Sequence, residues 1–298
     1  MVGGTMLKKE NLSGRIFDIF NYGLMGCLIL ITLYPCYYVL VASVSDPVAV
    51  YASKGMLFYP KGFSLSTYRQ VLENNAIWIG YKNTIIYVAA GGTLSVLLTI
   101  TAAYGLTRKG VPGQNALIMM IVFTMYFSGG MIPTYMVVKS IGILDTRLSM
   151  ILPGAITTYN LIIAMSYFRG IPYELEEAAK IDGANAYQVL WKIMLPLAKP
   201  IVAVISLYYM VSIWNGFYNA LLYLYDQALY PLQLILREIL IQGNTELVAV
   251  ADSADNALMY EENLKYAIIV VSTVPILCVY PFIQRYFVKG VMIGAVKG

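Results

Sequence analysis

Long apolar segments alternate with shorter polar ones along most of this sequence. A helix that crosses the hydrocarbon core of a bilayer needs about 20 mostly apolar residues, and six segments reach that length. The pattern therefore predicts an all-α polytopic membrane protein with six transmembrane helices. The expected spans are residues 17–43, 83–106, 116–138, 148–168, 201–222 and 266–287.

Three of the expected spans contain residues that kink or interrupt helices. Such kinks act as hinges in some membrane proteins, and in others they only let neighbouring helices pack closely. Both interpretations stay open from the sequence. The residues are Gly129, Gly130, Pro133, Pro153, Pro275 and Pro281.

The distribution of basic residues predicts the orientation. Cytoplasmic loops of membrane proteins carry an excess of Lys and Arg. With the N-terminus inside, 12 of the 20 basic residues but only six of the 16 acidic ones face the cytoplasm. We therefore expect residues 1–15 and the C-terminus in the cytoplasm, residues 16–298 as one transmembrane domain, and outer loops at 44–82 and 223–265.

The composition agrees with a membrane protein and removes several chemistries. The chain is 59% hydrophobic and 12% charged, whereas soluble domains carry about 25% charged residues. It has no histidine, the commonest metal ligand and general base, so we expect no metal site and no catalytic residue. It also has no Gly-Lys pair for a phosphate-binding loop, so any ATP must be bound by another chain.

The expected spans hold almost no ionisable residues. Asp18 lies at the start of the first and Arg285 near the end of the last. Proton-driven carriers usually place carboxylates or histidines at mid-membrane. A hydrolase would need a general acid, a general base or an activated nucleophile there. The pattern disfavours both, although a stand-alone carrier whose backbone carbonyls bind sodium remains an alternative.

One polar face in the fifth expected span could line a passage for a hydroxyl-rich solute. Amides, hydroxyls and aromatic rings recur there at helical spacing, and sugars bind through such groups. The alternative is that these side chains join helices together or form an aromatic belt at the bilayer surface. The candidates are Tyr208, Ser212, Trp214, Asn215, Tyr218 and Asn219.

A charged elbow, residues 172–196, separates the fourth and fifth expected spans. Glutamates at its start favour a helix over Glu174–Lys180, Asp182-Gly183 favours a break, and a second helix is expected from Tyr187 to Leu195. Ala178 and Ala179 would give a small-residue face. Either a soluble partner docks on this elbow, or it is an amphipathic helix lying on the lipid headgroups.

The two outer loops are each expected to contain a short helix. In the first, Thr67 would open the helix, with Gln70 completing a weak capping box. In the second, the helix covers about 232–242 and an acidic tract follows it. Long structured loops of this kind are either connectors or binding surfaces.

The elbow carries the residues of a family resemblance. The chain resembles permease subunits of binding-protein-dependent ABC importers at every fixed position of their signature: Glu-Ala-Ala, three residues, Gly, nine residues, Ile-x-Leu-Pro. The matching residues are Glu177, Ala178, Ala179, Gly183, Ile193, Leu195 and Pro196.

The resemblance implies a type I ABC importer permease fold in a bacterial cytoplasmic membrane, and no enzymatic activity on this chain. It also implies a second homologous permease, two ATPase subunits or domains that bind ATP and Mg, and an extracellular, membrane-tethered substrate-binding protein. The elbow, which includes Glu174 and Asp182, would be the coupling helix of this chain and would sit in a cleft of one ATPase. The C-terminal tail, with Lys289, Lys297 and Gly298, would also reach the ATPases.

Further motifs narrow the resemblance to MalG-like permeases of the LplC/YtcP-type sub-branch. They are Trp214-Asn215-x-Phe217, the stretch from Phe127 to Tyr135, and the ending from Gln284. This sub-branch is associated with complex or acidic oligosaccharides. In the maltose importer of the same family the sugar is held chiefly by the other permease, so the passage candidates here would line a passage rather than form a defined site. A non-sugar cargo on the same architecture is the alternative.

Overall fold

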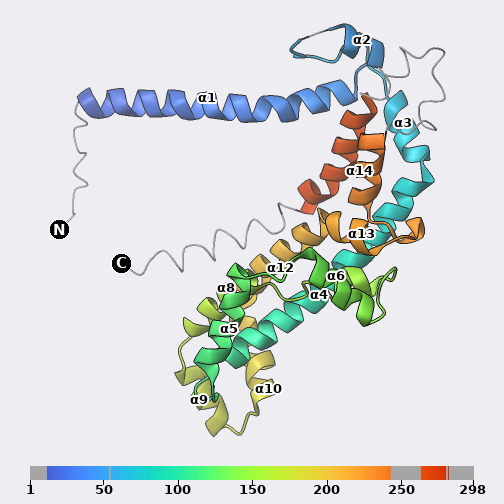
Figure 1. Cartoon of the computed structure of the whole chain (residues 1–298). Coiled ribbons are helices and arrows are strands. Elements are labelled where there is room, and N and C mark those ends of the chain that lie inside the picture. The colour runs from blue at the N-terminus through green and yellow to red at the C-terminus, as the bar shows by residue number, and fades with distance from the viewer. Residues whose placement is uncertain (1–11, 54, 243–262, 280, 282–298) are drawn as a thin grey trace. The chain divides into compact units, whose positions relative to one another are not determined.

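The computed structural model describes residues 12–53, 55–242, 263–279 and 281, and these residues are mostly helical. They divide into two compact units. The first comprises the described residues of Met1–Val71 and Thr245–Val270, and the second those of Leu72–Asn244 and Val271–Gly298. Figure 1 shows the helices of both units.

The first unit is built on α1 (Leu12–Ser43), followed by α2 (Pro47–Ala52) and the start of α3 (Ser66–Glu73). Only 6% of the most apolar part of α1 is buried, as expected for a helix whose sides face lipid or another subunit. The small core consists of Val41, Ala42 and Leu57, with partly buried side chains packed on it.

The polar centre of the first unit explains a difference from the sequence prediction. Helix α3 begins at Ser66, one residue before the predicted start. The Thr67 side chain is buried and accepts a hydrogen bond from the amide of Asn263 at 3.2 Å. The same amide donates to the carbonyl of Ser45 at 3.1 Å. Thr67 therefore binds the start of the helix Asn263–Val279.

The second unit contains the remaining helices in chain order. They are α4 (Asn75–Thr107), α5 (Gln114–Tyr126), α6 (Met131–Ser140), α7 (Leu148–Ile151), α8 (Thr158–Arg169), α9 (Glu174–Ile181), α10 (Ala186–Gln188), a π-helix (Val189–Met194), α11 (Leu195–Leu197), α12 (Lys199–Trp214), α13 (Tyr218–Tyr223), a 3-10 helix (Gln227–Leu229) and α14 (Leu232–Gln242). The outer-loop helix predicted at 232–242 is confirmed by α14.

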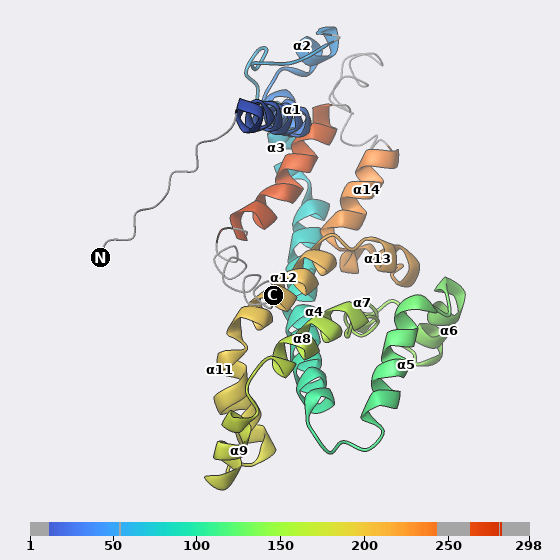
Figure 2. The same ribbon diagram turned by 90° about the vertical axis from the view of Figure 1, so that its left-hand side faces the viewer.

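Two helices among the described residues are long and apolar enough to cross a membrane without a bend, Gly14–Ser43 and α4. Two bent pairs also qualify if each is one span: α5 with α6, bent by 116°, and Ala186–Leu197 with α12, bent by 83°. Figure 2 shows the first of these bends. The arrangement of six spans stays a prediction.

The breaks fall where the sequence contains glycine and proline. Between α5 and α6, Gly130 has φ +90°, a conformation that strains residues with a side chain. The fourth expected span is α7 and α8, separated by residues that include Pro153 and Gly154. Pro275 differs, because the helix Asn263–Val279 continues past it.

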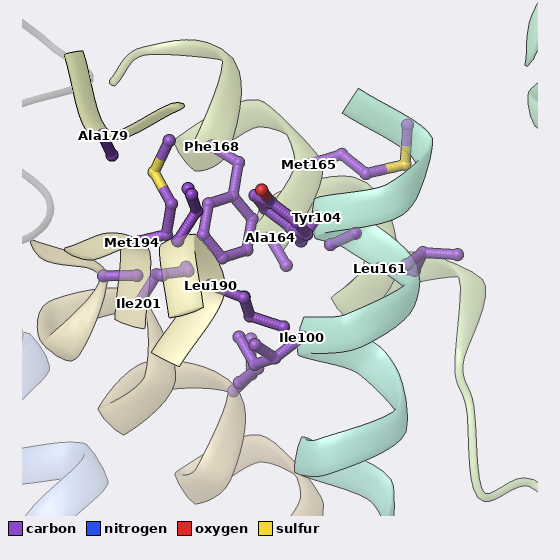
Figure 3. Close-up of a cluster of buried hydrophobic side chains, with 14 residues drawn as sticks. Ile100, Tyr104, Leu161, Ala164, Met165, Phe168, Ala179, Leu190, Met194 and Ile201 are labelled. Atoms are coloured by element: carbon purple, nitrogen blue, oxygen red, sulfur yellow. The ribbon is translucent and has the colours of Figure 1, made fainter. Parts of the chain in front are cut away.

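The core of the second unit forms around α4, which packs against α8, α12 and α14. Its main apolar cluster, drawn in Figure 3, joins α4, α8, the elbow and α12. The Tyr104 and Phe168 rings meet edge to face, with centroids 6.2 Å apart. The elbow is therefore attached to the membrane helices by buried side chains as well as by the chain itself.

Candidate functional site

The first limb of the elbow is α9. Glu174, Glu176 and Glu177 occupy its first turn, where negative charge interacts favourably with the helix dipole. The helix ends at Ile181, Asp182 is its C-cap residue, and Gly183 follows with φ +81°. The predicted helix and the predicted break are both confirmed.

The second limb begins at Ala186, one residue before the predicted start. Asn185 and Gln188 form a reciprocal capping box, with both hydrogen bonds at 2.9 Å. The chain then runs through the π-helix Val189–Met194 into α11. Pro196 has no N–H to donate, which disturbs the regular α-helical hydrogen bonding of the preceding turn.

The two alanines of the motif point in different directions. Ala178 is exposed, whereas Ala179 is buried in the apolar cluster with Val189 and Met194 of the second limb. A methyl group lets the two limbs approach closely. The small-residue face expected for a partner is therefore divided, and only Ala178 is accessible on it.

A buried ion network, which the sequence does not reveal, joins the elbow to α4. The Glu176 side chain is 3% exposed and forms ion pairs with Arg108 and, at 2.9 Å, with Lys180. Arg108 follows the last residue of α4, lies over the Tyr104 ring at 4.8 Å, and donates to the Thr107 hydroxyl at 3.1 Å.

The network keeps Glu176 ionised. Burial on its own would raise the pKa of Glu176, but hydrogen bonds from Lys180 and Arg108 outweigh it and the pKa lies below the ordinary 4.5. A carboxylate with a lowered folded-state pKa stabilises the fold above the unfolded-state pKa, and this stabilisation is lost as pH falls through the lowered value. At neutral pH the network is therefore fully charged.

A second contact ties the α4–α5 connection to the elbow. The ammonium group of Lys109 lies 4.1 Å from the centre of the Tyr173 ring, where a cation is attracted to the ring face. Tyr173 directly precedes α9. Lys109 thus contacts the start of the first limb, and Arg108 contacts its buried face.

The outward face of the elbow is acidic around an apolar centre. Ile181 and Tyr187 are 86% and 77% exposed, and Figure 2 shows α9 at one end of the second unit. Exposed large apolar side chains rimmed by polar ones are typical of protein–protein contacts. The exposed acidic residues are Glu174, Glu177 and Asp182.

The end of the motif anchors the second limb. Ile193 and Leu195 are half-buried and pack against the apolar cluster, whereas Pro196 is exposed. Their position favours a structural role for the Ile-x-Leu-Pro part. Lys289, Lys297 and Gly298 lie outside the described residues.

The passage candidates do not all lie on one accessible face. Trp214 is buried, its indole N–H donates to the carbonyl of Ser272 at 3.3 Å, and its ring lies 6.2 Å from Tyr81. The structure thus places Trp214 in the packing between helices rather than on the expected lining. The other candidates, Tyr208, Ser212, Asn215, Tyr218 and Asn219, are exposed.

The exposed candidates have neighbours that the sequence pattern does not reveal. The Tyr208 ring on α12 lies 6.1 Å from that of Tyr159 on α8, which is also exposed. The Tyr218 hydroxyl donates to the sulfur of Met131 at 2.8 Å. These tyrosines carry hydroxyls and ring faces on the accessible surface of the second unit.

A mostly helical membrane subunit with a polar, accessible elbow is the class that the described residues and this site define. The chain belongs to the family described as binding-protein-dependent transport system inner membrane component, whose model matches residues 12–293. It is therefore an ABC transporter permease, a transport subunit rather than an enzyme, and it is located in the cytoplasmic membrane.

Known proteins of this family match nearly the whole chain. Protein LplC of Bacillus subtilis is 43% identical over 96% of both chains. The polygalacturonan/rhamnogalacturonan transport system permease protein YtcP of Bacillus subtilis is 42% identical over 96% of this chain and 100% of its own. One chain of a bacterial ABC transporter involved in import of the acidic polysaccharide alginate superimposes with TM-score 0.85 at 36% identity, covering 93% of this chain and 98% of its own.

Proposed function

We propose that this permease forms half of an alternating-access passage in an ATP-driven importer of acidic or complex oligosaccharides. A second, homologous permease supplies the other half. Two ATPase subunits bind ATP and Mg beneath them, and an extracellular, lipid-anchored binding protein delivers the sugar. The observation that carries the proposal is the elbow, an exposed acidic and apolar surface fixed by buried contacts to the membrane helices.

The elbow has the properties of a coupling surface. Its accessible residues surround Ile181 and include Glu174, Glu177, Ala178 and Asp182. Its inner face is fixed by Ala179 and the second limb, and Gly183 sets the turn between the limbs. Closure of the ATPases on ATP would move this surface and open the passage outward.

The orientation follows from the distribution of basic residues. The elbow and both termini lie in the cytoplasm, and the tail with Lys289, Lys297 and Gly298 contributes to the ATPase interface. Residues 44–82 and 223–265 lie outside and contact the binding protein. Residues 16–298 then act as one transmembrane permease domain.

Two observations support an acidic or complex oligosaccharide as cargo. Two of the similar proteins, at 42% and 36% identity, are named for polygalacturonan/rhamnogalacturonan and for the acidic polysaccharide alginate. The exposed residues of the proposed passage offer amide, hydroxyl and aromatic groups, which bind sugar hydroxyls and ring faces without a fixed charge. Such a lining lets a chain of sugar residues pass instead of holding one tightly.

Uptake measurements test this function. Deleting the gene is expected to abolish ATP-dependent uptake of labelled trigalacturonate, and the wild-type gene is expected to restore it. Deleting the binding protein is expected to give the same loss. Uptake that survives depletion of ATP would contradict the ATP-driven mechanism, while undiminished trigalacturonate uptake with loss of a peptide or polyol would overturn the cargo.

Replacing Asn215 tests the proposed passage. Asn215 directly follows α12; its backbone N–H donates to the carbonyl of Val211, and its side chain is exposed. Asn215→Leu is therefore expected to keep the fold and the bound ATPase but to lower uptake several-fold, because a sugar-binding amide is lost. Uptake of labelled oligosaccharide by equal amounts of assembled complex measures this, and an unchanged rate would assign the residue to packing.

A further inference from the structure

Helix α4 is the only helix in the described part of the second unit that is long and apolar enough to cross a bilayer without a bend. Its 33 residues correspond to a length of about 50 Å. The other candidate spans of this unit are bent by 116° and 83°. A continuous helix carries a displacement from one end to the other, whereas a hinge absorbs part of it.

The inner end of α4 is joined to the elbow by charge. Arg108 forms an ion pair with Glu176. The Glu176 side chain is 3% exposed and the Arg108 side chain is 14% exposed. The Tyr104 ring below Arg108 and the Thr107 hydroxyl beside it limit the directions in which the guanidinium can point. Separating the pair would leave buried charge without full compensation, which is costly, so the ion pair favours joint movement of the two elements.

The outer end of α4 is joined to residues 228–232 by hydrogen bonds. The amide of Asn83 donates to the carbonyls of Ala228 and Tyr230 at 2.7 and 3.1 Å. The Tyr87 hydroxyl donates to the carbonyl of Leu229 at 2.7 Å, and the backbone N–H of Leu232 donates to the Thr84 hydroxyl at 2.8 Å. This segment leads into α14, within the loop proposed to contact the binding protein.

Close packing reinforces the outer joint. At Gly80, one turn before these side chains, an added Cβ would lie 2.9 Å from the Cα of Leu232 and 2.8 Å from the Cδ1 of Ile235. Only glycine permits so close an approach of α4 and α14. Both ends of α4 are therefore fixed to elements outside the membrane-crossing part of the unit.

We infer that α4 connects the ATPase-facing elbow to the segment facing the binding protein, and that the Arg108–Glu176 ion pair is the joint through which the elbow moves it. The inference rests on the proposed function. Arg108 and Glu176 act as positioning residues, because their effect on ATP hydrolysis passes through the elbow. Lys180 binds the same carboxylate but lies on α9 itself, so it does not connect the elbow to α4.

The matched pair Glu176→Gln and Lys180→Gln tests the joint. Each variant is assembled with its partner permease and ATPases in proteoliposomes. ATP hydrolysis is measured with and without binding protein loaded from a mixed pool of acidic and neutral oligosaccharides. Glu176→Gln is expected to reduce the stimulation by binding protein at least about fivefold, the lower range of coupling between sites. Its unstimulated hydrolysis and yield of complex are expected to match the wild type.

Lys180→Gln and two further changes complete the test. Lys180→Gln is expected to retain most of the stimulation, and the exchange Arg108→Glu with Glu176→Arg to recover at least half of it. Arg108→Gln is expected to lose stimulation like Glu176→Gln, which keeps the test valid if one of the two fails to assemble.

Wild-type stimulation in Glu176→Gln or Arg108→Gln, or an equal loss in Lys180→Gln, would overturn the inference. Absence of the ATPases from the wild-type complex would instead overturn the proposed function.

Discussion

Ile181→Asp is expected to separate this permease from its ATPases and to reduce transport at least about tenfold. Ile181 is the most exposed large apolar residue of the elbow, at 86%. A hot-spot residue at the centre of an interface contributes about 2 kcal/mol or more to binding, which is a factor of about 30 in affinity. The carboxylate of an aspartate at this position would also have to be desolvated when the ATPase docks. The amount of ATPase that co-purifies with the permease measures the effect.

Phe63→Asp is the matched control for this prediction. Phe63 is 72% exposed and lies in the loop expected outside the membrane. The same substitution there is expected to leave the co-purifying ATPase unchanged. ATPase loss in Phe63→Asp, or ATPase retention in Ile181→Asp, would contradict the placement of the docking surface on the elbow.

Gly183→Val is expected to reduce uptake at least tenfold while the protein still inserts in the membrane. Gly183 has φ +81°, and nothing lies within 4 Å of an added Cβ. The expected defect therefore comes from the backbone alone, because a β-branched residue in the left-handed region costs about 1–3 kcal/mol. The elbow would relieve this strain by changing the angle between its limbs. Uptake per assembled complex measures the loss.

Gly183→Asn separates backbone strain from side-chain bulk. Asparagine adopts left-handed conformations more readily than other residues with a side chain. This variant is therefore expected to keep most of the uptake. Equal losses in Gly183→Asn and Gly183→Val would show that the conformation at this position is not what matters.

The elbow could be predicted closely because its signals are local. Acidic residues at the start of α9, the glycine after Asp182 and the motif spacing all act within a few residues of each other. The same stretch and a few further motifs predict the family, whose model matches residues 12–293. Helix α14 was equally predictable, because an apolar periodic segment follows a proline.

The inner face of the elbow could not be predicted, because its partners are distant in sequence. Arg108 lies 68 positions before Glu176, and nothing in either local pattern pairs them. The sequence does not show which of the three glutamates in the first turn of α9 is buried. The packing of α9 beside the end of α4 shows that it is Glu176. The same holds for Trp214. Its spacing favours a lining role, but its hydrogen bond to the carbonyl of Ser272 places it in the packing between helices.

Attaching a photoactivatable maleimide at Ala178→Cys, which is exposed one helical turn before Ile181 and leaves that anchor in place, tests the central claim most directly. Cys27, Cys36 and Cys278 would first be replaced by alanine, so that the label reacts at one position. The account predicts labelling from the cytoplasmic side only and, after illumination of the assembled importer, a covalent adduct between permease and ATPase. Labelling of intact cells by a membrane-impermeant reagent, or a labelled complex without any ATPase adduct, would contradict it.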